Sequence, residues 1–372
     1  MNQKILNGIS HLREALEGAT KVFVVCDSSY PFLNIKTDIE NMGKPHVLFS
    51  DFTPNPVYED VCKGIDLFQI TKCDSILAVG GGSAIDVAKC IKLAVLAKEG
   101  NDALIPPLVS TRVECDGSKI PFIAIPTTAG TGSESTHNAV MYYEGVKMTV
   151  TNDGILPDYA VLEPSVLKTL PLYQKKCTMM DALCQGIESW WSVNSTEESY
   201  EYSRKTIELI MANWHKYIFE NDDEASKQIM LAANYGGRAI NITQTTAAHA
   251  FSYKITSLYN LPHGHAVAVC LPEIWEYMLG NMDKCIDSRG SAYLSDIFYL
   301  IAKTMDRENP VKAIELFRQM MKEMDLKNPV SENREEELNM LSTSVNPVRL
   351  KNNPVRIDLN SARILYFSIL SR

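Results

Sequence analysis

The sequence predicts two domains of different fold class, an amino-terminal α/β domain with a doubly wound parallel sheet and an all-α carboxy-terminal domain. Before residue 160, short apolar runs rich in β-branched residues alternate with amphipathic stretches, the rhythm of parallel βαβ units. Glycine-rich turns follow two of these runs directly. From residue 164 onward, helical periodicity is almost continuous. We therefore predict domains at residues 1–163 and 164–372.

In the first domain, four apolar runs bounded by turn residues predict buried strands, at residues 22–26, 45–49, 75–79 and 121–125. Helices are expected at residues 57–71 and 84–97. In the second domain, apolar residues recur at helical spacing in residues 178–193, 198–217, 224–241, 246–258, 266–279, 291–304, 310–324 and 360–370. Residues 331–353 are expected to be rich in loops.

Composition excludes several classes of protein. The formal net charge of -9 leaves no basic surface to replace the counterions of nucleic acid. No apolar run approaches the roughly 18–20 residues that a membrane span needs, and the amino terminus shows no secretory signal. The nine cysteines are scattered without a C-x-x-C pair, which is typical of reduced thiols. We expect a cytoplasmic protein that binds neither membrane nor nucleic acid.

Two turns at the carboxyl ends of predicted strands favour binding of a phosphate-containing ligand. The first, G-G-G-S-A-I-D-V-A-K at residues 80–89, joins a buried strand to a helix whose free amides favour negative charge. The second, P-T-T-A-G-T-G-S-E at residues 126–134, is rich in hydroxyl groups, and both turns face the edge of the sheet where ligands bind. The candidate cofactor-binding residues are Gly80, Gly81, Gly82, Ser83, Thr127, Thr128, Thr131 and Ser133.

Asp27 closes the first predicted strand. A carboxylate there can accept hydrogen bonds from the ribose of a dinucleotide and repel a 2′-phosphate, which would favour NAD over NADP. The alternative is an Asx turn with Ser28 and Ser29.

Three of the seven histidines, His249, His263 and His265, lie in one segment. Two of them, with a carboxylate upstream, indicate a cation site. His249 and His263 lie in a largely apolar segment and Asp181 in a helical one, and two imidazoles with one carboxylate leave room for a substrate oxygen. Gln185 shares the helix face of Asp181. Glu188 is near that face, as a surface group or one behind the ligands. His265 is expected behind the ligands or on the surface. The alternative for each histidine is a buried, hydrogen-bonded ring.

Four signatures together resemble the iron-containing (group III) alcohol dehydrogenase family: G-G-G-S-A-I-D-V-A-K, P-T-T-A-G-T-G-S-E, D-A-L-C-Q-G-I-E and H…P-H-G. The resemblance covers essentially the whole chain. It implies a dinucleotide-binding α/β domain, a helical domain and a metal in the cleft between them. Asp181, His249 and His263 fall on the family's metal-ligand positions, and Lys147 matches a lysine on the cofactor side.

The chain departs from the family pattern at two positions. Gln185 stands where many members have a histidine that is a fourth metal ligand, and Tyr253 stands where many have a histidine close to the nicotinamide. The metal is therefore left open among Fe²⁺, which we expect, Zn²⁺ and Mn²⁺. Whether Gln185 is a ligand also stays open.

These departures are similar to the phosphonoacetaldehyde reductase branch of the family. A dianionic substrate requires cations near the metal, and Lys254, Arg349 and Lys351 are candidates for that role. Their alternative is a solvated surface charge. We expect a metal-dependent NAD(P)H oxidoreductase that reduces this aldehyde to 2-hydroxyethylphosphonate, a step of phosphonate biosynthesis. Tyr253, ribose hydroxyls or water would supply the proton, so Tyr253 and Lys254 are the candidate catalytic residues.

Three alternatives remain. One is a reductase or dehydrogenase of simple aliphatic alcohols or diols. Another is a lyase of the dehydroquinate synthase type, which the lack of a dense cluster of Lys, Arg, Asn and His around the metal histidines disfavours. A binding or structural protein would need neither the three ligands nor the two turns. The oligomeric state stays open, with a homodimer among the alternatives.

Overall fold

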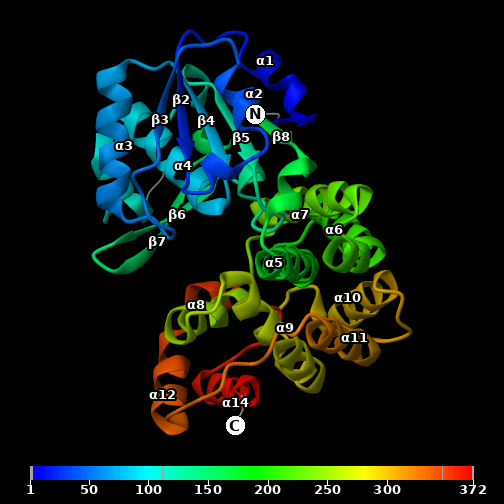
Figure 1. The fold of residues 1–372 in the computed structure, drawn as a ribbon. Coiled ribbons are helices and arrows are strands. Elements are labelled where there is room, and N and C mark those ends of the chain that lie inside the picture. The colour runs from blue at the N-terminus through cyan, green and yellow to red at the C-terminus, as the bar shows by residue number, and fades with distance from the viewer. Residues whose placement is uncertain (1–2, 111–112, 346, 371–372) are drawn as a thin grey trace. The chain divides into compact units, whose positions relative to one another are not determined.

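The computed structural model describes residues 3–110, 113–345 and 347–370, apart from the side chains of Ser110, Val348 and Arg349. The chain divides into two compact units (Figure 1). The α/β unit comprises Met1–Leu170 and Asn221–Met230, and the helical unit comprises Pro171–Glu220 and Leu231–Arg372.

The α/β unit contains a six-stranded parallel sheet in the order β1-β8-β5-β4-β2-β3. Its strands are β1 (Lys4–Asn7), β2 (Val22–Cys26), β3 (His46–Phe49), β4 (Ser75–Gly80), β5 (Phe122–Pro126) and β8 (Tyr159–Leu162). The predicted parallel sheet is confirmed. Strands β1 and β8 and the antiparallel hairpin of β6 (Asn138–Tyr143) and β7 (Val146–Thr151) were not predicted. Most residues of β1, β6 and β7 are partly exposed, so these strands lack the continuous apolar run of a buried strand, and β8 has only four residues.

Helices of the α/β unit cover a sheet whose central strands are buried along their whole length. The helices are α1 (Leu12–Ala15), α2 (Lys36–Glu40), α3 (Tyr58–Thr71) and α4 (Gly82–Leu96). A continuous core joins Phe23 and Ile76 of the strands to Ile65 of α3 and Ile91 of α4. Because apolar side chains pack on it, the sheet holds β4 and β5 rigidly where the two glycine-rich turns begin.

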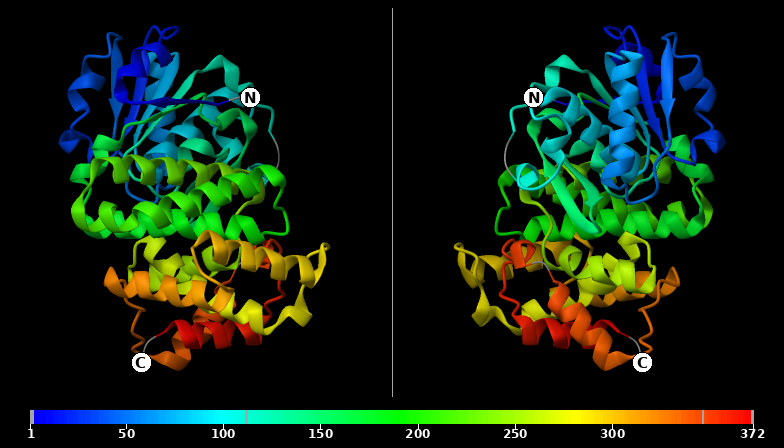
Figure 2. Two further views of the ribbon diagram at one scale, coloured as in Figure 1. Left: turned by 90° about the vertical axis from the view of Figure 1, so that its right-hand side faces the viewer. Right: turned by 90° about the vertical axis from the view of Figure 1, so that its left-hand side faces the viewer.

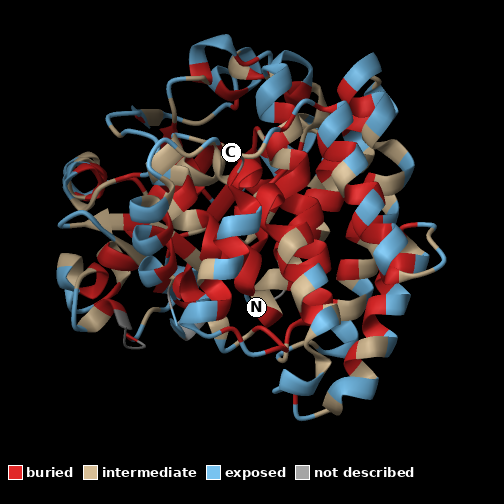
Figure 3. Cartoon of the chain, turned by 90° about the horizontal axis from the view of Figure 1, so that it is seen from below, coloured by how far each residue is buried: buried red, intermediate tan, exposed pale blue. Residues whose placement is uncertain are grey.

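The helical unit is built from α5 (Leu172–Trp191), α6 (Glu197–His215), most of α7 (Asp223–Thr243), α8 (Ala247–Tyr259), α9 (His263–Gly280), α10 (Gly290–Thr304), α11 (Pro310–Glu323), α12 (Arg334–Ser344), α13 (Pro347–Leu350) and α14 (Leu359–Ile369). The predicted all-α domain is confirmed. Figure 2 shows α5 and α6, drawn in green, running side by side. Figure 3 shows many of the helices with one buried and one exposed side. Among the described residues, no helix combines the length and apolar character that crossing a membrane requires.

The expectation of loop for residues 331–353 was wrong for α12 and α13. Only Leu338 and Leu341 of α12 are buried apolar residues, so the helical pattern is weak in the sequence. The helix forms because it packs against α14 and α8. Tertiary packing, more than local propensity, stabilises a helix of this kind.

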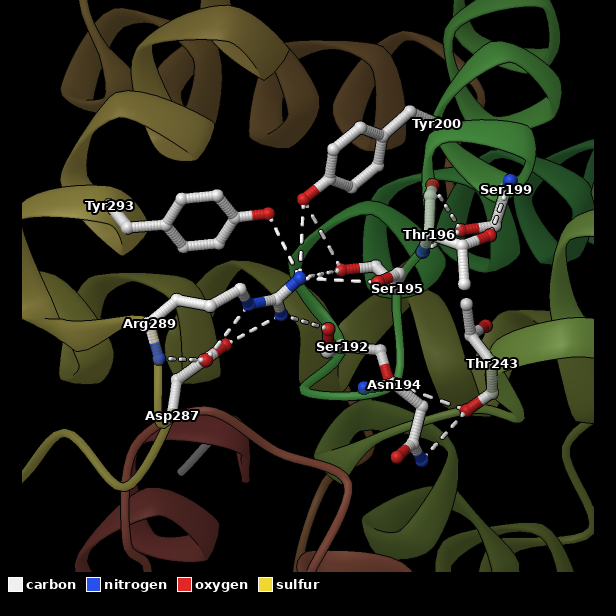
Figure 4. Close-up of polar contacts among 10 residues, drawn as sticks. All are labelled: Ser192, Asn194, Ser195, Thr196, Ser199, Tyr200, Thr243, Asp287, Arg289 and Tyr293. Atoms are coloured by element: carbon white, nitrogen blue, oxygen red, sulfur yellow. Dashed lines mark hydrogen bonds and ion pairs between the residues drawn. The ribbon is translucent and has the colours of Figure 1, made fainter.

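Arg289, at the start of α10, fixes the turn that follows α5 (Figure 4). Its guanidinium donates to the carbonyl oxygens of Ser192 (2.9 Å) and Ser195 (3.2 Å) and to the carboxylate of Asp287 (2.7 Å). The guanidinium lies over the aromatic ring of Tyr293, with its carbon 4.3 Å from the centre of that ring. Several charge-assisted bonds from one planar group hold the carboxyl end of α5 in a single position.

Candidate functional site

Asp181, His249 and His263 come together in the helical unit. One ligand atom of each lies within 4.8 Å of the others. They arrive from the middle of α5, the first turn of α8 and the first residue of α9. Nε2 of His249 lies 3.3 Å from Oδ1 of Asp181, and Nε2 of His263 lies 4.0 Å from the same oxygen.

The electrostatics of this cluster favour a cation. Burial disfavours a charged His249 ring, but the carboxylates of Glu188 and Asp181 outweigh it and raise the pKa of His249 to about 9. Nε2 of His249 is buried and makes no hydrogen bond within the described part of the chain. Two imidazole nitrogens and one carboxylate oxygen suit Fe²⁺, Zn²⁺ or Mn²⁺, so the donor set fits a divalent metal. The His263 side chain is 36% exposed, which leaves one side of the cluster accessible to a small molecule.

Gly264 allows the start of α9 to lie against the backbone of α5. A Cβ at this position would lie 2.0 Å from the carbonyl oxygen of Cys177 and 2.9 Å from Cβ of Asp181. No side chain fits at that separation. The glycine that follows His263 therefore sets how closely its ring approaches Asp181.

The two residues that depart from the family pattern lie beside the ligands. Gln185 is 3% exposed and stands one helical turn after Asp181. Gly236 of α7 provides space for it, since a Cβ there would lie 3.1 Å from Oε1 of Gln185. The ring of Tyr253 stacks on that of His263, with the ring centres 6.0 Å apart and the planes 14° from parallel.

The predicted substrate cations belong to α8 and to the segment that follows α13. Lys254 is partly buried on α8, and Lys351 is exposed in the turn after α13. The side chain of Arg349 lies outside the described residues. The segment is nevertheless attached next to α8, because α13 packs against that helix and Asn352 donates to the carbonyl oxygen of Thr245 (3.1 Å).

His265 lies apart from the ligand cluster. It is 4% exposed, and its ring bonds to the Tyr173 hydroxyl (2.8 Å) and the Lys327 carbonyl (2.9 Å). These contacts tie the start of α9 to the start of α5. His265 is thus a buried, hydrogen-bonded ring.

In the α/β unit, the two glycine-rich turns touch each other. The amide of Thr127 donates to the carbonyl of Gly80 (3.0 Å), continuing the pairing of β4 with β5. A Cβ on Gly81 would lie 3.4 Å from Cγ2 of Thr128. A Cβ on the next glycine, Gly82, would lie 3.1 Å from Cγ2 of Thr131. The amides at the start of α4 and the threonines of the second turn therefore border the same space.

The carboxylate of Asp27 has two structural roles. It accepts hydrogen bonds from the amide (2.9 Å) and hydroxyl (2.5 Å) of Ser29, which is the Asx turn. Its second oxygen lies 3.4 Å from the amide of Gly81, at the first glycine-rich turn. A carboxylate oxygen has room for further donors, so these contacts leave a role toward ribose open.

Lys89, the last residue of the first motif, connects the two turns, a role that was not predicted from the sequence. Its ammonium is fully buried and donates to the carbonyl (2.6 Å) and hydroxyl (3.0 Å) of Ser133 and to Thr136 Oγ1 (2.9 Å). Ser133 donates in turn to Asp86 (2.7 Å), so its hydroxyl is already engaged. Burial lowers the pKa of Lys89 to about 8. A lysine inside the apolar run V-A-K-C-I was the signal available in the sequence.

Lys147 lies in β7, opposite Tyr142. Loss of solvation raises the pKa of Asp86, and Lys147 is close enough to oppose that shift. The predicted cofactor-side lysine therefore stands near the carboxylate that Ser133 contacts. Its approach to a cofactor stays a prediction.

The chain matches two families of known sequence. Residues 3–164 match "Iron-containing alcohol dehydrogenase", and residues 176–365 match "Fe-containing alcohol dehydrogenase family, C-terminal". Long-chain-alcohol dehydrogenase 1 of Geobacillus thermodenitrificans is 30% identical over 72% of this chain and 68% of its own length. Phosphonoacetaldehyde reductase of Streptomyces viridochromogenes is 32% identical over 62% of this chain and 60% of its own.

A solved structure has the same fold. The NAD⁺ complex of sulfoacetaldehyde reductase from Bifidobacterium kashiwanohense superimposes with a TM-score of 0.87 at 23% identity, covering 99% of this chain and 97% of that one.

Gly264→Ala should weaken both metal binding and the fold. The methyl group would displace α9 from α5, at an overpacking cost of about 1–3 kcal/mol. Helix propensity alone would instead stabilise the variant by about 1 kcal/mol. Thermal unfolding and Zn²⁺ titration measure the two effects. Gly280→Ala is the control, because it lies in the same helix with nothing within 4 Å of the new Cβ. Unchanged Zn²⁺ affinity in Gly264→Ala would contradict the close-approach argument.

Gly81→Val should weaken NADH binding by at least about tenfold, because its branches would fill the space next to Thr128 where a pyrophosphate must approach. Fluorescence titration with NADH measures this. Gly18→Val is a matched control, since Gly18 has no atom within 4 Å of its Cβ position. Equal affinities for the two variants would rule out this placement of the cofactor.

Proposed function

Since the chain belongs to the iron-containing alcohol dehydrogenase family, whose members are NAD-dependent oxidoreductases, we propose that it reduces phosphonoacetaldehyde to 2-hydroxyethylphosphonate. Aldehyde reduction is supported mainly by the cluster of Asp181, His249 and His263, which is accessible on the His263 side. The phosphonate substrate is supported by the 32% identity to a phosphonoacetaldehyde reductase.

The reaction adds a hydride and a proton to the aldehyde while NAD(P)H becomes NAD(P)⁺. A bound divalent metal would supply a Lewis acid for the carbonyl oxygen, and a bound reduced nicotinamide would supply the hydride. Asp181, His249 and His263 would hold the metal, with Gln185 beside them. The Tyr253 hydroxyl, on a ring that stacks on His263, delivers the proton to the product oxygen.

The α/β unit binds the cofactor in this proposal. The amides at the start of α4 would hold the pyrophosphate, because the helix dipole favours an anion there. The hydroxyls of Thr127, Thr128 and Thr131 would bind it from the second turn, and Lys147, near Asp86 of α4, would approach the cofactor from β7. Lys89 contributes indirectly, because its bonds hold the second turn in place. The predicted cofactor domain, residues 1–163, lies within the α/β unit, and the predicted metal domain, residues 164–372, includes the whole helical unit.

Cations of the helical unit bind the phosphonate. The substrate carries roughly two negative charges near neutral pH, by analogy with phosphate monoesters. Lys254 follows Tyr253 on α8, and the segment with Arg349 and Lys351 is attached at the same helix. Each charge-assisted hydrogen bond offsets desolvation by about 1.5–3 kcal/mol.

The second candidate is a dehydrogenase of simple alcohols. It is favoured by the 30% identity to a long-chain-alcohol dehydrogenase over 72% of this chain. A methanol dehydrogenase of Bacillus methanolicus is similarly related, at 31% identity over 70% of this chain. In this case the lysines have no substrate role, and uncharged aldehydes are reduced as well as anionic ones.

Lys254→Met should raise KM for phosphonoacetaldehyde by about 10- to 100-fold and leave propionaldehyde nearly unaffected. The reason is that only the first substrate has an anionic group to desolvate. Steady-state kinetics on both aldehydes measure the split, with Lys303→Met of α10 as the control. Faster reduction of propionaldehyde than phosphonoacetaldehyde by the unsubstituted enzyme would favour the second candidate. Equal losses on both aldehydes would indicate damaged packing instead.

Asp27→Asn should increase the use of NADPH relative to NADH by about tenfold. The amide keeps an acceptor for Ser29 but removes the charge that repels a 2′-phosphate. The ratio of kcat/KM for the two cofactors measures it. Asp116→Asn is a matched control, because Asp116 makes the same kind of turn with Ser118. An unchanged ratio would leave Asp27 as a turn residue only.

A further inference from the structure

Glu188 is a fully buried carboxylate directly behind the candidate metal cluster. It stands seven residues after Asp181 on α5, about two helical turns, so both side chains project from the same face. Its relative exposure is 0%. A buried carboxylate is costly unless it is paired or hydrogen-bonded, so its hydrogen-bond partners indicate its role.

Three donors converge on Glu188. Thr246 Oγ1 donates to Oε1 (2.6 Å), the amide of Ala248 donates to the same oxygen (2.8 Å), and Nδ1 of His249 contacts Oε2. The Thr246 hydroxyl is oriented by Trp191, whose Nε1–H donates to it (2.9 Å), so its own proton points to the carboxylate. An acceptor-only group matches this set, whereas a neutral amide would present N–H to a donor in either orientation.

These bonds decide which nitrogen His249 turns toward Asp181. With Oε2 of Glu188 against Nδ1, the proton of a singly protonated ring stays on Nδ1. The lone pair then lies on Nε2, the atom 3.3 Å from Oδ1 of Asp181. The opposite tautomer would place N–H at Nε2 and leave no ligand atom there.

Glu188 also places the backbone of His249. Ala248 is the second residue of α8, and the N-cap residue Thr246 makes no side-chain capping bond to this helix. The carboxylate of Glu188 takes over that role from α5, at the positive end of the helix dipole. One group thus fixes where α8 begins and how the ring of His249 is turned.

We infer that Glu188 is a positioning residue that selects the Nε2 ligand of His249 through its bonds to Thr246, Ala248 and the ring. The inference rests on the proposed metal site. The positioning by Glu188 is a different effect from the negative charge that this residue adds to the site. Two substitutions separate these two effects. Glu188→Gln keeps the shape and removes the charge, and Glu188→Asp keeps the charge but is too short to hold all three donors.

Co²⁺ titration of the metal-free protein provides the first test. Both variants should bind Co²⁺ about 10- to 100-fold more weakly than the unsubstituted protein, as for other groups that orient metal ligands. Glu273→Gln of α9 is the control, since it makes the same change in a residue paired with Arg318. If Glu188→Asp binds as tightly as the unsubstituted protein, charge alone matters and the inference is wrong.

The second test is the ¹⁵N spectrum of the His249 ring in the metal-free protein at a pH where the ring is neutral. The unsubstituted protein should carry its proton on Nδ1, and Glu188→Gln should shift it to Nε2. An unchanged tautomer would overturn the inference. This readout needs no metal, so it decides the role of Glu188 even if absence of Co²⁺ binding were to disprove the proposed metal site.

Thr246→Val covers the case in which both Glu188 variants fail to fold. It leaves Glu188 and His249 intact and removes one donor that fixes the carboxylate. Co²⁺ affinity should fall about three- to tenfold, the equivalent of one hydrogen bond. A change of less than twofold in folded Thr246→Val would count against the inference.

Discussion

Two buried carboxylates on one face of α5 impose the main constraint on the helical unit. Asp181 is 3% exposed and Glu188 is 0% exposed, and removing such groups from water is costly unless donors or cations compensate. His249 lies between them and contacts both. The start of α8 supplies an amide and a hydroxyl to Glu188. The arrangement of α8 around α5 follows from this requirement.

The close approach of α9 to α5 completes the cluster. A histidine at the start of a helix can reach Asp181 only if the two backbones come near each other, and Gly264 removes the side chain that would prevent it. Farther along α5, Arg289 anchors the turn after Trp191 to the start of α10. The ligand-bearing helix is therefore held at the cluster and beyond its carboxyl end. A site held in this way keeps its ligands in place before a metal binds.

The α/β unit uses a buried charge in a similar manner. Lys89 donates hydrogen bonds to Ser133, Thr136 and the carbonyl of Asn138, so the second turn is attached to α4. Threonines of the second turn then border the positions that side chains on Gly81 and Gly82 would occupy. Lys89, two turns into α4, holds the second turn in place. The threonine hydroxyls of that turn therefore lie next to the amides at the start of α4.

Local patterns in the sequence were enough to predict the parallel sheet, the helical domain and the ligand types, because burial periodicity and ligand chemistry are properties of short segments. Asp181, His249 and His263 could be proposed together from their residue types and motifs alone. What the sequence could not provide is the set of partners between distant segments. Glu188 and Lys89 are charged residues in apolar helices, and only the tertiary structure shows that one contacts His249 and the other Ser133. Helix α12 likewise depends on its packing against α14, since its own amphipathic pattern is weak.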